Sequence, residues 1–322
     1  MPSRSALITG VTGQDGSYLA ELLVKKGYRV FGLLRRPGSL NSPHLASVRE
    51  DIDILYGDLT DQASIDKAVK RAAPDEVYNL AAQSFVGTSF AQPVLTGEVT
   101  GLGVLRLLEA VRSHATGARV FQASSNEVFG QAETEPQSES TPFHPRSPYG
   151  VAKVYAYWVA VNYRETYSMF ISNGILFNHE SPRRGIESVM RKVCRGAARI
   201  ALGESHTIAL GNLDARRDWG YAPEYVELMW LMLQHLPARD YVGATGESHS
   251  VREMVEEAFR VAGVDDWSSH VIDDPLSRRP SDVYKYRGDG SRAEIELGWK
   301  PETRFRKLVK IMVEAELRQL RA

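Results

Sequence analysis

Several features that assign a chain to a specialised class are scarce or missing among these 322 residues. The single cysteine, Cys194, excludes an internal disulfide, and no apolar run approaches the ~20 residues that span a bilayer. Basic and acidic residues nearly balance, at 39 and 40, so the composition does not indicate a surface that coats nucleic acid. The first residues also lack the charged and apolar regions of a signal peptide. We therefore expect a cytoplasmic protein that binds neither membranes nor nucleic acid.

The composition is that of an ordered globular protein with a large core. Hydrophobic residues make up 43% of the chain and charged residues 25%, which excludes a disordered chain. At this length we expect two lobes, because domains usually span roughly 100–200 residues. Cys194 has neither a histidine nor a second cysteine close to it in the sequence, so we expect a packed thiol and no metal site.

A glycine-rich turn lies near the start of the chain, between a predicted strand and a predicted helix. The strand is Ala6–Thr9, the turn is Gly10–Gly16, and an apolar helical pattern follows from Tyr18. Glycines let the backbone approach a phosphate closely, and the start of a helix offers free N–H groups and the positive end of its dipole. The arrangement predicts a dinucleotide-binding turn.

The second predicted strand, Tyr28–Leu33, indicates which dinucleotide binds. It is followed by Arg35 and Arg36, where folds that prefer NAD commonly place an acidic residue for the ribose 2′-hydroxyl. A guanidinium group suits a 2′-phosphate, which favours NADP. The alternative is that two exposed arginines simply begin a loop.

Tyr149 and Lys153 are four residues apart in a segment that we predict to be helical. This spacing puts both side chains on one helix face, where the ammonium group can favour the ionised phenol and make the tyrosine a usable base. A solvated helix face is the alternative interpretation of the pair.

Strands and helices alternate along the first half of the chain, which predicts an α/β fold with a doubly wound parallel sheet (Rossmann). We expect an NADP-binding domain at residues 1–178, with a return of the chain near 220–245, and a smaller nucleotide-sugar-binding lobe that is mainly residues 179–322. In the helix expected at residues 94–112, Leu102, Leu105, Leu108 and Val111 have core spacing. Other expected elements are strands near Ile52–Tyr56, Val77–Leu80, Val120–Ala123 and Phe170–Leu176, and helices near Gln62–Ala72 and Tyr149–Tyr167.

Further motifs accompany the glycine turn and the Tyr–Lys pair. They are Asn79–Ser84, Gln122–Glu127, Pro145–Tyr149, Leu176–Gly185 and Arg217–Gly220. Together these motifs resemble the extended short-chain dehydrogenase/reductase superfamily, and more narrowly the GDP-mannose 4,6-dehydratases, nearly from end to end. The string Asn178–Gly185 is the most specific of them.

Two positions depart from the resembled pattern. The family usually carries Thr-Ser-Glu where this chain has Ser125-Asn126-Glu127, and its usual tyrosine two residues later is Phe129 here. Serine keeps the hydroxyl group of threonine, so the chemistry is expected to survive. Asn126 and Phe129, with Phe85, leave open a related substrate such as GDP-mannoheptose, which differs at C6.

The resemblance implies dehydration of GDP-D-mannose to GDP-4-keto-6-deoxy-D-mannose, with Ser125, Glu127, Tyr149 and Lys153 as catalytic residues. Tyr149 takes the C4 hydroxyl proton while a hydride passes to NADP, Ser125 bonds the reacting oxygen, and Lys153 holds the cofactor ribose. Glu127 removes the C5 proton, water leaves from C6, and the hydride returns to C6. Ser125 and Glu127 follow a predicted buried strand, at the sheet edge where α/β folds bind ligands, although a surface carboxylate is another interpretation of Glu127.

The resemblance also implies further contacts. Those to NADP are Gly10, Thr12, Gly13, Gln14, Asp15, Gly16, Arg35, Asp58, Leu59, Leu80, Ala81, Ala82, Ser84, Tyr149, Lys153, His179 and Arg184. Those to the GDP-sugar are Ser84, Asn178, Lys192, Arg217, Arg279 and Asp282. From the residues alone, Asp58 can equally cap the helix before Gln62, His179 can make a structural hydrogen bond, and Arg217 and Arg279 can be solvated charges.

We expect a homo-oligomer, either a dimer or a tetramer. The helices predicted at residues 94–112 and Tyr149–Tyr167 carry apolar and aromatic residues, including Tyr155, Tyr157 and Trp158, that one sheet cannot fully cover. In the resembled family a polar loop like Arg35–Pro43 reaches the cofactor site of a neighbouring subunit. Two other functions stay open: a GDP-sugar 4-reductase or epimerase, which could dispense with Glu127, and a silent NADP sensor, against which the intact Tyr–Lys pair argues.

Overall fold

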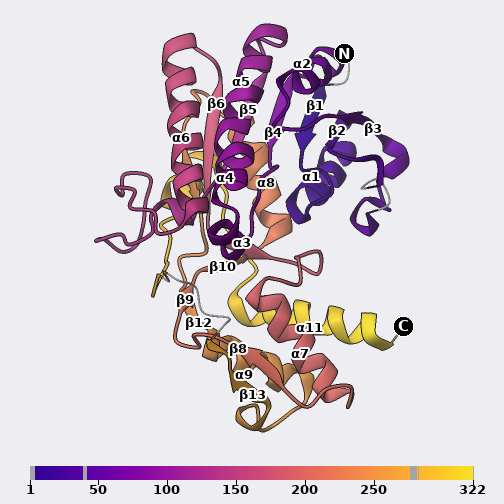
Figure 1. Ribbon diagram of the computed structural model, residues 1–322, viewed down its shortest axis with the longest axis vertical. Helices are drawn as coiled ribbons and strands as arrows, with labels where there is room; N and C mark the ends of the chain where they lie inside the picture. Colours follow the sequence, from indigo (N-terminus) through magenta and orange to yellow (C-terminus); the bar gives the residue numbers. More distant parts are fainter. Residues whose placement is uncertain (1–3, 39–41, 276–280, 282, 322) are drawn as a thin grey trace.

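The computed structural model describes residues 4–38, 42–275, 281 and 283–321, and it has two lobes (Figure 1). The larger lobe is built on a parallel sheet, and the smaller one comes from the second half of the chain. None of the helices formed by these residues is both long enough and apolar enough to cross a membrane. Arg279 and Asp282, two of the predicted substrate contacts, lie outside the described residues.

Seven strands form the large sheet, and all neighbouring strands run parallel. They are β1 (Ser5–Thr9), β2 (Arg29–Leu34), β3 (Ile52–Tyr56), β4 (Glu76–Asn79), β5 (Arg119–Ser125), β6 (Ile171–Leu176) and β11 (Tyr241–Gly243). Their order is β11-β6-β5-β4-β1-β2-β3. Because the order reverses between β1 and β4, the loops after these strands open a crevice at the carboxyl edge. The predicted doubly wound sheet is confirmed.

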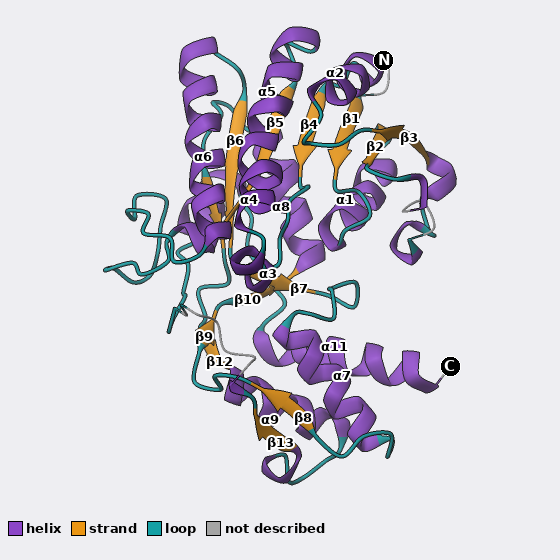
Figure 2. Ribbon diagram, viewed as in Figure 1, coloured by secondary structure: helices purple, strands orange, loops and turns teal. Residues whose placement is uncertain are grey.

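Helices cover both faces of this sheet (Figure 2). Those on one face are α1 (Gln14–Lys25) and α8 (Ala222–Gln234), and those on the other are α2 (Gln62–Ala72), α5 (Gly103–His114) and α6 (Pro148–Tyr167). Successive residues of a strand point to opposite faces, so Ile8 and Tyr78 are buried toward α1 and α8, while Leu7 and Val77 are buried toward α2 and α5. Burial on both sides explains the nearly continuous apolar runs of the strands.

The helix expected at residues 94–112 is interrupted. A short helix, α4 (Pro93–Thr96), leads into a π-helical turn at Gly97–Leu102, and α5 follows it. Within the turn, Thr100 Oγ1 accepts a hydrogen bond of 3.0 Å from the backbone N–H of Gln83. The π turn is therefore tied to the loop that follows β4, which is a common position for such turns near functional sites.

The π turn also changes which side chains of this helix are buried, because it shifts the residues around the helix axis. Leu108 and Val111 are buried as expected, and they lie in the core under α2. Leu105 is half-buried and packs against the same core, as expected, whereas Leu102 is half-buried and its assignment to the core was wrong. Leu102 instead lines an apolar surface pocket between this segment and α6, together with Tyr155.

The smaller lobe has a core of three helices that pack on one another. They are α7 (Val189–Ala201), α9 (Val251–Ala262) and α11 (Phe305–Arg321). Cys194 is fully buried in this core, and burial raises the pKa of its thiol above the usual value, as a packed thiol requires. The other elements are α3 (Val86–Ala91), α10 (Ser291–Leu297), and the strand pairs β7 (Asn178–Glu180) with β10 (Trp219–Tyr221), β9 (Arg216–Arg217) with β12 (His249–Ser250), and β8 (Ile208–Leu210) with β13 (Val271–Asp273).

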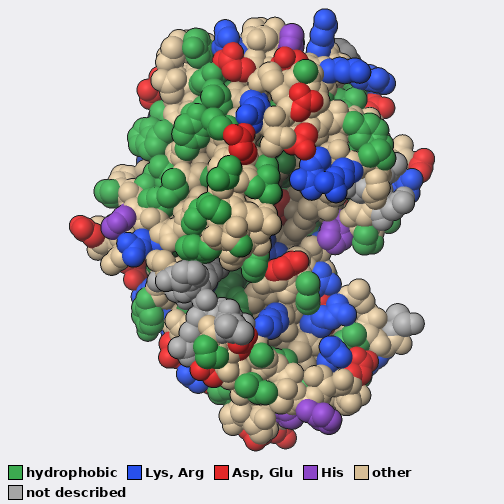
Figure 3. Space-filling view, in the orientation of Figure 1, with side chains coloured by type: hydrophobic (Ala, Val, Ile, Leu, Met, Phe, Trp, Pro, Cys, Tyr) green, Lys and Arg blue, Asp and Glu red, His purple; other side chains and the backbone are tan. Residues whose placement is uncertain are grey.

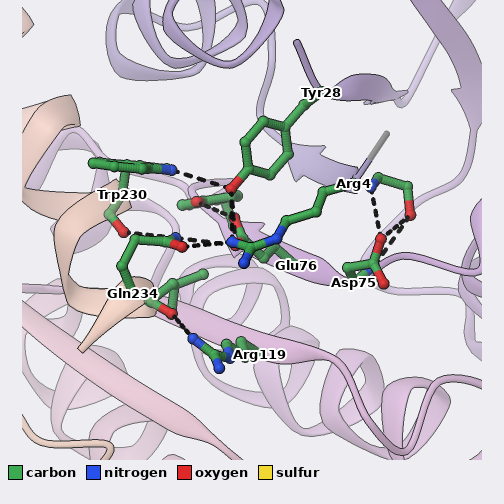
Figure 4. Close-up of polar contacts among 10 residues, drawn as sticks. Arg4, Tyr28, Asp75, Glu76, Arg119, Trp230 and Gln234 are labelled. Carbon is green, nitrogen blue, oxygen red and sulfur yellow. Dashed lines mark hydrogen bonds and ion pairs between the residues drawn. The ribbon is translucent and has the colours of Figure 1, made fainter. Parts of the chain in front are cut away.

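A buried carboxylate anchors α8 at the amino ends of the strands, opposite the crevice (Figure 4). Glu76, the first residue of β4, accepts hydrogen bonds from the hydroxyls of Tyr28 (3.1 Å) and Tyr78 (2.6 Å). It also accepts one from the side-chain amide of Gln234 on α8 (3.0 Å). Trp230, on the same helix, donates to the Tyr28 hydroxyl at 3.1 Å. This anchoring network therefore joins α8 to the sheet at the end that lies away from the crevice.

Candidate active site

The glycine-rich turn lies at the carboxyl end of β1, in the crevice. Gly10 has a φ of +70°, and a Cβ on Gly16 would lie 2.3 Å from the carbonyl oxygen of Gly10, so neither position accepts a larger residue. Gly13 is the N-cap of α1 and supplies no side chain to the first N–H groups of the helix. These groups can therefore bind an anion. The turn fits the pyrophosphate of a dinucleotide.

The first turn of α1 also carries an ion pair that the sequence did not predict. His179 Nε2 lies 2.8 Å from Asp15 Oδ2, and His179 Nδ1 lies 2.7 Å from the carbonyl oxygen of Phe177. A carboxylate and a carbonyl only accept hydrogen bonds, so both ring nitrogens are protonated and the ring is a cation. Burial opposes both charges, but the pairing raises the pKa of His179 and lowers that of Asp15.

Gln14 reinforces this contact between α1 and β7. Its Nε2 donates to the carbonyl oxygen of His179 at 3.1 Å, and its Oε1 accepts from the Ser181 hydroxyl at 2.8 Å. Three residues further on, Arg184 Nε lies 3.2 Å from Glu180 Oε2. The segment that leads into the smaller lobe is therefore held directly against the glycine-rich turn.

Tyr149 and Lys153 lie on the buried face of α6. The helix begins where Ser147 Oγ accepts the backbone N–H of Gly150 at 3.0 Å. Lys153 Nζ lies 5.7 Å from the centroid of the Tyr149 ring and donates to the carbonyl oxygen of Ala123 on β5 at 2.7 Å. Both side chains are buried, so the alternative of a solvated helix face is wrong.

Ser125 and Glu127 lie beside this pair, where β5 ends in a 3-10 turn at Asn126–Val128. Ser125 Oγ accepts the backbone N–H of Glu127 at 3.2 Å and also hydrogen-bonds the Tyr149 phenol. Glu127 is 9% exposed, and its charge reaches Tyr149. The interpretation of Glu127 as a surface carboxylate is therefore wrong, and the four predicted catalytic residues form one buried cluster.

Burial determines the protonation of this cluster in the absence of a ligand. It raises the pKa of Tyr149 above the usual value; the hydrogen bond from Ser125 opposes this rise, and the charge of Glu127 adds to it. Burial also lowers the pKa of Lys153 to about 8. The spacing of Tyr149 and Lys153 in the sequence predicts that the ammonium group lowers the pKa of the phenol. In the ligand-free chain burial outweighs that effect, and Tyr149 keeps its proton.

The loops after β2 and β3 form the other end of the crevice. Arg35 and Arg36 are exposed just past β2. Asp58 Oδ1 accepts from the N–H and the hydroxyl of Thr60 at 2.9 and 2.8 Å. Burial raises the pKa of Asp58, but these bonds and the charges of both arginines lower it overall. The N-cap of α2 is Asp61, so the interpretation of Asp58 as that cap is wrong.

The loop after β4 closes the floor of the crevice against the glycine-rich turn. Thr9 Oγ1, at the end of β1, accepts the backbone N–H groups of Leu80 and Ala81, both at 3.1 Å. A Cβ on Gly10 would lie 2.9 Å from the Ala81 nitrogen, which shows how closely the two loops pack. The predicted cofactor contacts thus lie on four successive loops and two further elements: Gly10, Thr12, Gly13, Gln14, Asp15 and Gly16 after β1; Arg35 after β2; Asp58 and Leu59 after β3; Leu80, Ala81, Ala82 and Ser84 after β4; Tyr149 and Lys153 on α6; His179 and Arg184 on and after β7.

The predicted substrate contacts lie where the smaller lobe meets the sheet. Asn178 pairs with Trp219 between β7 and β10, and Lys192 lies in the first turn of α7. Arg217 is buried, with its guanidinium 5.2 Å from the centroid of the Tyr286 ring. It donates from Nη1 to two backbone carbonyl oxygens, each at 2.8 Å. Arg217 is therefore a positioned cation and not the solvated charge that was the alternative.

Asp218 is a structural residue of this region whose role the sequence did not reveal. It is fully buried and accepts the N–H and the hydroxyl of Thr245 at 2.9 and 2.7 Å, the N–H of Gly246 at 2.9 Å, and that of Gly288 at 3.2 Å. These donors are far from Asp218 in sequence, so no local pattern could have indicated them. The carboxylate fixes the backbone next to Arg217.

Comparison with known proteins shows the family of the chain. Residues 7–312 match the family profile described as GDP-mannose 4,6 dehydratase. The chain is 49% identical over 328 residues to GDP-mannose 4,6 dehydratase 1 of Arabidopsis thaliana, which covers 98% of this chain and 90% of that protein. This chain belongs to the GDP-mannose 4,6-dehydratase family. It is also 47% identical over 346 residues to the human GDP-mannose 4,6 dehydratase, with 99% and 93% covered.

Membership of the GDP-mannose 4,6-dehydratase family confirms the predicted reaction. The chain is a hydro-lyase that removes water from GDP-mannose, and neither a GDP-sugar 4-reductase or epimerase nor a heptose-specific enzyme is favoured. Phe129, one of the three residues that left the heptose open, is fully buried and packs against Phe143 and Phe177. It is therefore part of the core beneath the site.

Solved structures share the fold of this member of the GDP-mannose 4,6-dehydratase family. A dTDP-glucose 4,6-dehydratase of Streptomyces venezuelae, with NAD bound, aligns with a TM-score of 0.86 at 25% identity over 98% of both chains. The RMD protein of Pseudomonas aeruginosa, complexed with NADPH, aligns with a TM-score of 0.83 at 24% identity over 98% of this chain and 100% of that one. The second likeness concerns the fold alone.

The buried charge of Lys153 predicts a pH dependence of stability. Its pKa falls from 10.5 in the unfolded chain to about 8 in the folded chain, so between these values the unfolded chain binds more protons. The contribution of Lys153 to the free energy of unfolding should therefore rise with pH across this window, by up to about 1.4 kcal/mol per pH unit. For Lys153→Met, the free energy of unfolding measured by chemical denaturation without cofactor should lack this rise with pH. Lys67→Met, at an exposed position on α2, is the control and should keep it; identical pH slopes for wild type and Lys153→Met would contradict the assignment.

Proposed function

We propose that the chain carries out this dehydration with a tightly held NADP and with Tyr149 and Glu127 as the groups that move protons. The supporting observation is the buried cluster in which Ser125 hydrogen-bonds the Tyr149 phenol while the charge of Glu127 reaches the same phenol. A reductase or epimerase needs only the hydroxyl and the Tyr–Lys pair. A buried carboxylate beside them supplies the base that an elimination requires.

The cofactor in this proposal is a nicotinamide nucleotide, which is supported by the NAD complex of the similar Streptomyces venezuelae dehydratase. The choice of NADP is supported by Arg35 and Arg36, whose guanidinium groups suit a 2′-phosphate at the end of β2. The glycine-rich turn would hold the pyrophosphate, and Lys153 the ribose near the nicotinamide. When bound, the nicotinamide would supply an acceptor for the hydride from C4 of the hexose and would donate that hydride to C6.

The side chains of the cluster then divide the proton transfers between them. Tyr149 takes the C4 hydroxyl proton at its phenolate oxygen, and Ser125 orients that hydroxyl by a hydrogen bond. Because burial raises the pKa of the phenol, the ligand-bound pocket has to stabilise the phenolate. Glu127 removes the C5 proton and passes it to the C6 oxygen, which leaves as water. The proton that Tyr149 took balances the one restored at C5.

We propose that residues 1–178 bind the cofactor, with β11 as their return strand, and that residues 179–322 mainly bind the nucleotide sugar. Figure 3 shows a notch between the two lobes, with Lys and Arg side chains on both of its sides. We assign the cations Arg217 and Lys192 to the pyrophosphate of the GDP-sugar. Asn178 pairs with Trp219, which follows Arg217 by two residues. Ser84, after β4, would contact both ligands.

A homo-oligomer, dimer or tetramer, is a further part of the proposal. Val94 is 78% exposed and Trp158 is 57% exposed, and Leu95, Val151 and Tyr155 are exposed around them. Apolar side chains gather over this region in Figure 3. A contiguous apolar patch of this kind is typical of an interaction surface. A cytoplasmic location also remains a proposal, and the single cysteine supports it.

Glu127→Gln should lower dehydration of GDP-mannose by about 10²–10⁴-fold, because the amide cannot remove the C5 proton. Oxidation at C4 needs only Tyr149 and Ser125, so reduced cofactor should accumulate and be visible by its absorbance. Mass spectrometry of the nucleotide sugar measures the loss of water. Glu133→Gln, at an exposed position, is the control and should behave as wild type. Wild-type dehydration by Glu127→Gln would remove its assigned role.

Arg35→Ala should weaken NADP binding by about 10- to 100-fold, because one or two charge-assisted hydrogen bonds to the 2′-phosphate are lost. NAD binding should change much less. Titration calorimetry with both cofactors measures the two losses. Arg29→Ala removes an exposed cation from the other end of β2 and should affect neither cofactor. Equal losses for NADP and NAD in Arg35→Ala would count against the 2′-phosphate.

Trp158→Asp should shift the oligomer toward the monomer, because it places a charge in the apolar patch over α6. Size-exclusion chromatography with light scattering gives the mass directly. Ile295→Asp, at a more exposed apolar position on α10, should keep the wild-type mass. A wild-type chain that is monomeric at every concentration would overturn the proposed oligomer.

A further inference from the structure

A row of polar side chains crosses three neighbouring strands of the large sheet. Thr9, Asn79 and Gln122 are direct partners in the register of β1, β4 and β5, so their side chains lie on one face of the sheet. None of the three is more than 2% exposed. The preceding positions on the same face of these strands are apolar and belong to the core under α2 and α5; they are Leu7, Val77 and Val120. The polar row therefore forms a separate layer, and in β1 and β4 it occupies the last residue before the crevice.

Hydrogen bonds join the row into one chain whose polarity is fixed from its first member. Thr9 Oγ1 accepts two backbone N–H groups of the loop after β4, so its own proton goes to Asn79 Oδ1 at 2.7 Å. Asn79 then has to present Nδ2 to Gln122 Oε1, which lies 2.7 Å away. This leaves one orientation for the Gln122 amide, with Nε2 donating to the carbonyl oxygen of Ala123 at 2.9 Å.

The same carbonyl oxygen holds the ammonium group of Lys153. Lys153 Nζ donates to the Ala123 oxygen at 2.7 Å, and its side chain is buried on α6. A carbonyl oxygen has two lone pairs, and Gln122 Nε2 fills one of them, so the ammonium group is confined to the other. The place of the ammonium group beside the Tyr149 ring is therefore set from β5 as well as from α6.

Stability alone does not account for this row of polar side chains. Replacing both partners of a buried hydrogen bond by apolar groups of the same shape can be nearly neutral or even stabilising. The apolar layer beneath the row shows that this face of the sheet packs such groups. The two ends of the row, however, meet the loop after β4 and Lys153, and we assign both to the cofactor. The row thus holds two parts of the site in a fixed relation.

We infer that Gln122 is a positioning residue, whose amide holds the Lys153 ammonium group at the one place on the Ala123 carbonyl from which it stabilises the Tyr149 phenolate. The inference rests on the proposed function, which gives Tyr149 the role of base and Lys153 the cofactor ribose. Gln122 moves no proton and contributes no atom to the products. Its effect on turnover passes through Lys153.

A double-mutant cycle in the holoenzyme tests whether Gln122 acts through Lys153. Gln122→Met should lower the turnover of GDP-D-mannose by about 10- to 100-fold, because a misplaced ammonium group stabilises the phenolate less well. In the Lys153→Met background the same substitution should change the residual turnover by less than about 2-fold, since no ammonium group is left to position. Mass spectrometry of the nucleotide sugar measures the loss of water. Losses that multiply in the double variant would overturn the inference.

The pH profile of turnover separates positioning from general damage to the site. Gln122→Glu keeps an acceptor for Asn79, but its second, ionised oxygen cannot donate to Ala123 and draws the ammonium group away from the phenol. Tyr149 should then ionise at a higher pH, so the loss of turnover should be largest near neutral pH and should shrink as the pH rises. The other charges that face Tyr149 or Lys153 are unchanged in this variant; they are Asp15, Glu127 and Arg184. A loss that is equal at every pH, or no loss at all, would overturn the inference even if Gln122→Met failed to fold.

Tyr78→Phe is the matched control for the loss of a buried hydrogen bond in the same sheet. Tyr78 precedes Asn79 in β4, points to the opposite face and donates to Glu76 at 2.6 Å. The variant should be less stable than wild type in chemical denaturation, yet it should keep the wild-type turnover and pH profile. If Tyr78→Phe lost turnover as Gln122→Met does, the effect would be that of any buried hydrogen bond, and the inference would fail.

Lys153→Met separates failure of this inference from failure of the proposed function. If Lys153→Met dehydrates GDP-mannose as wild type does, the role that the proposed function gives Lys153 is wrong, and the inference falls with it. If Lys153→Met loses turnover while Gln122→Met keeps the wild-type rate, only the inference is overturned.

Discussion

The contact between β7 and the first turn of α1 is the constraint on which the site depends. Asp15 projects from the turn that we propose binds the cofactor, where a lone carboxylate would repel a pyrophosphate. The protonated His179 neutralises it at 2.8 Å, and Gln14 fastens the backbone on either side. The same contact fixes where the chain leaves the sheet for the smaller lobe. The Asp15–His179 ion pair thus removes the repulsion between Asp15 and a phosphate, and it joins the glycine-rich turn to β7.

In the neighbouring cluster, burial has the largest effect on the pKa values of the side chains. The cluster of Ser125, Glu127, Tyr149 and Lys153 is dry enough that burial keeps the phenol protonated and brings the pKa of the ammonium down to about 8. Tyr149 is therefore not in the phenolate state that proton abstraction needs until ligands change the local field, whereas Lys153, with a pKa of about 8, carries its charge at neutral pH. A site of this kind has little reactivity when empty, which suits an enzyme whose intermediates have to be retained.

Local patterns in the sequence predicted the parts of this structure that depend on neighbouring residues. The helix Gln62–Ala72 has the bounds that its periodicity indicated, and the placement of Ser125 and Glu127 followed from the buried strand before them. The Asp15–His179 pair joins residues 164 positions apart, and its partners became visible only in the fold. The π turn at Gly97–Leu102 has no sequence signal that distinguishes it from a regular helix, so Leu102 was misplaced. The sequence also failed to predict that the pKa of Tyr149 is raised. The spacing of residues indicates which side chains are neighbours, but it does not show how deeply they are buried.

The network around Glu76 lies at the amino ends of the strands, whereas the reacting groups lie at the carboxyl ends. The residues that anchor the scaffold are therefore different from those that we propose take part in the reaction. Substitutions at the carboxyl edge leave the far edge of the sheet untouched, so the scaffold can tolerate them. Residues at the carboxyl edge can therefore change during evolution to bind another nucleotide sugar, while the residues at the amino edge keep the protein folded.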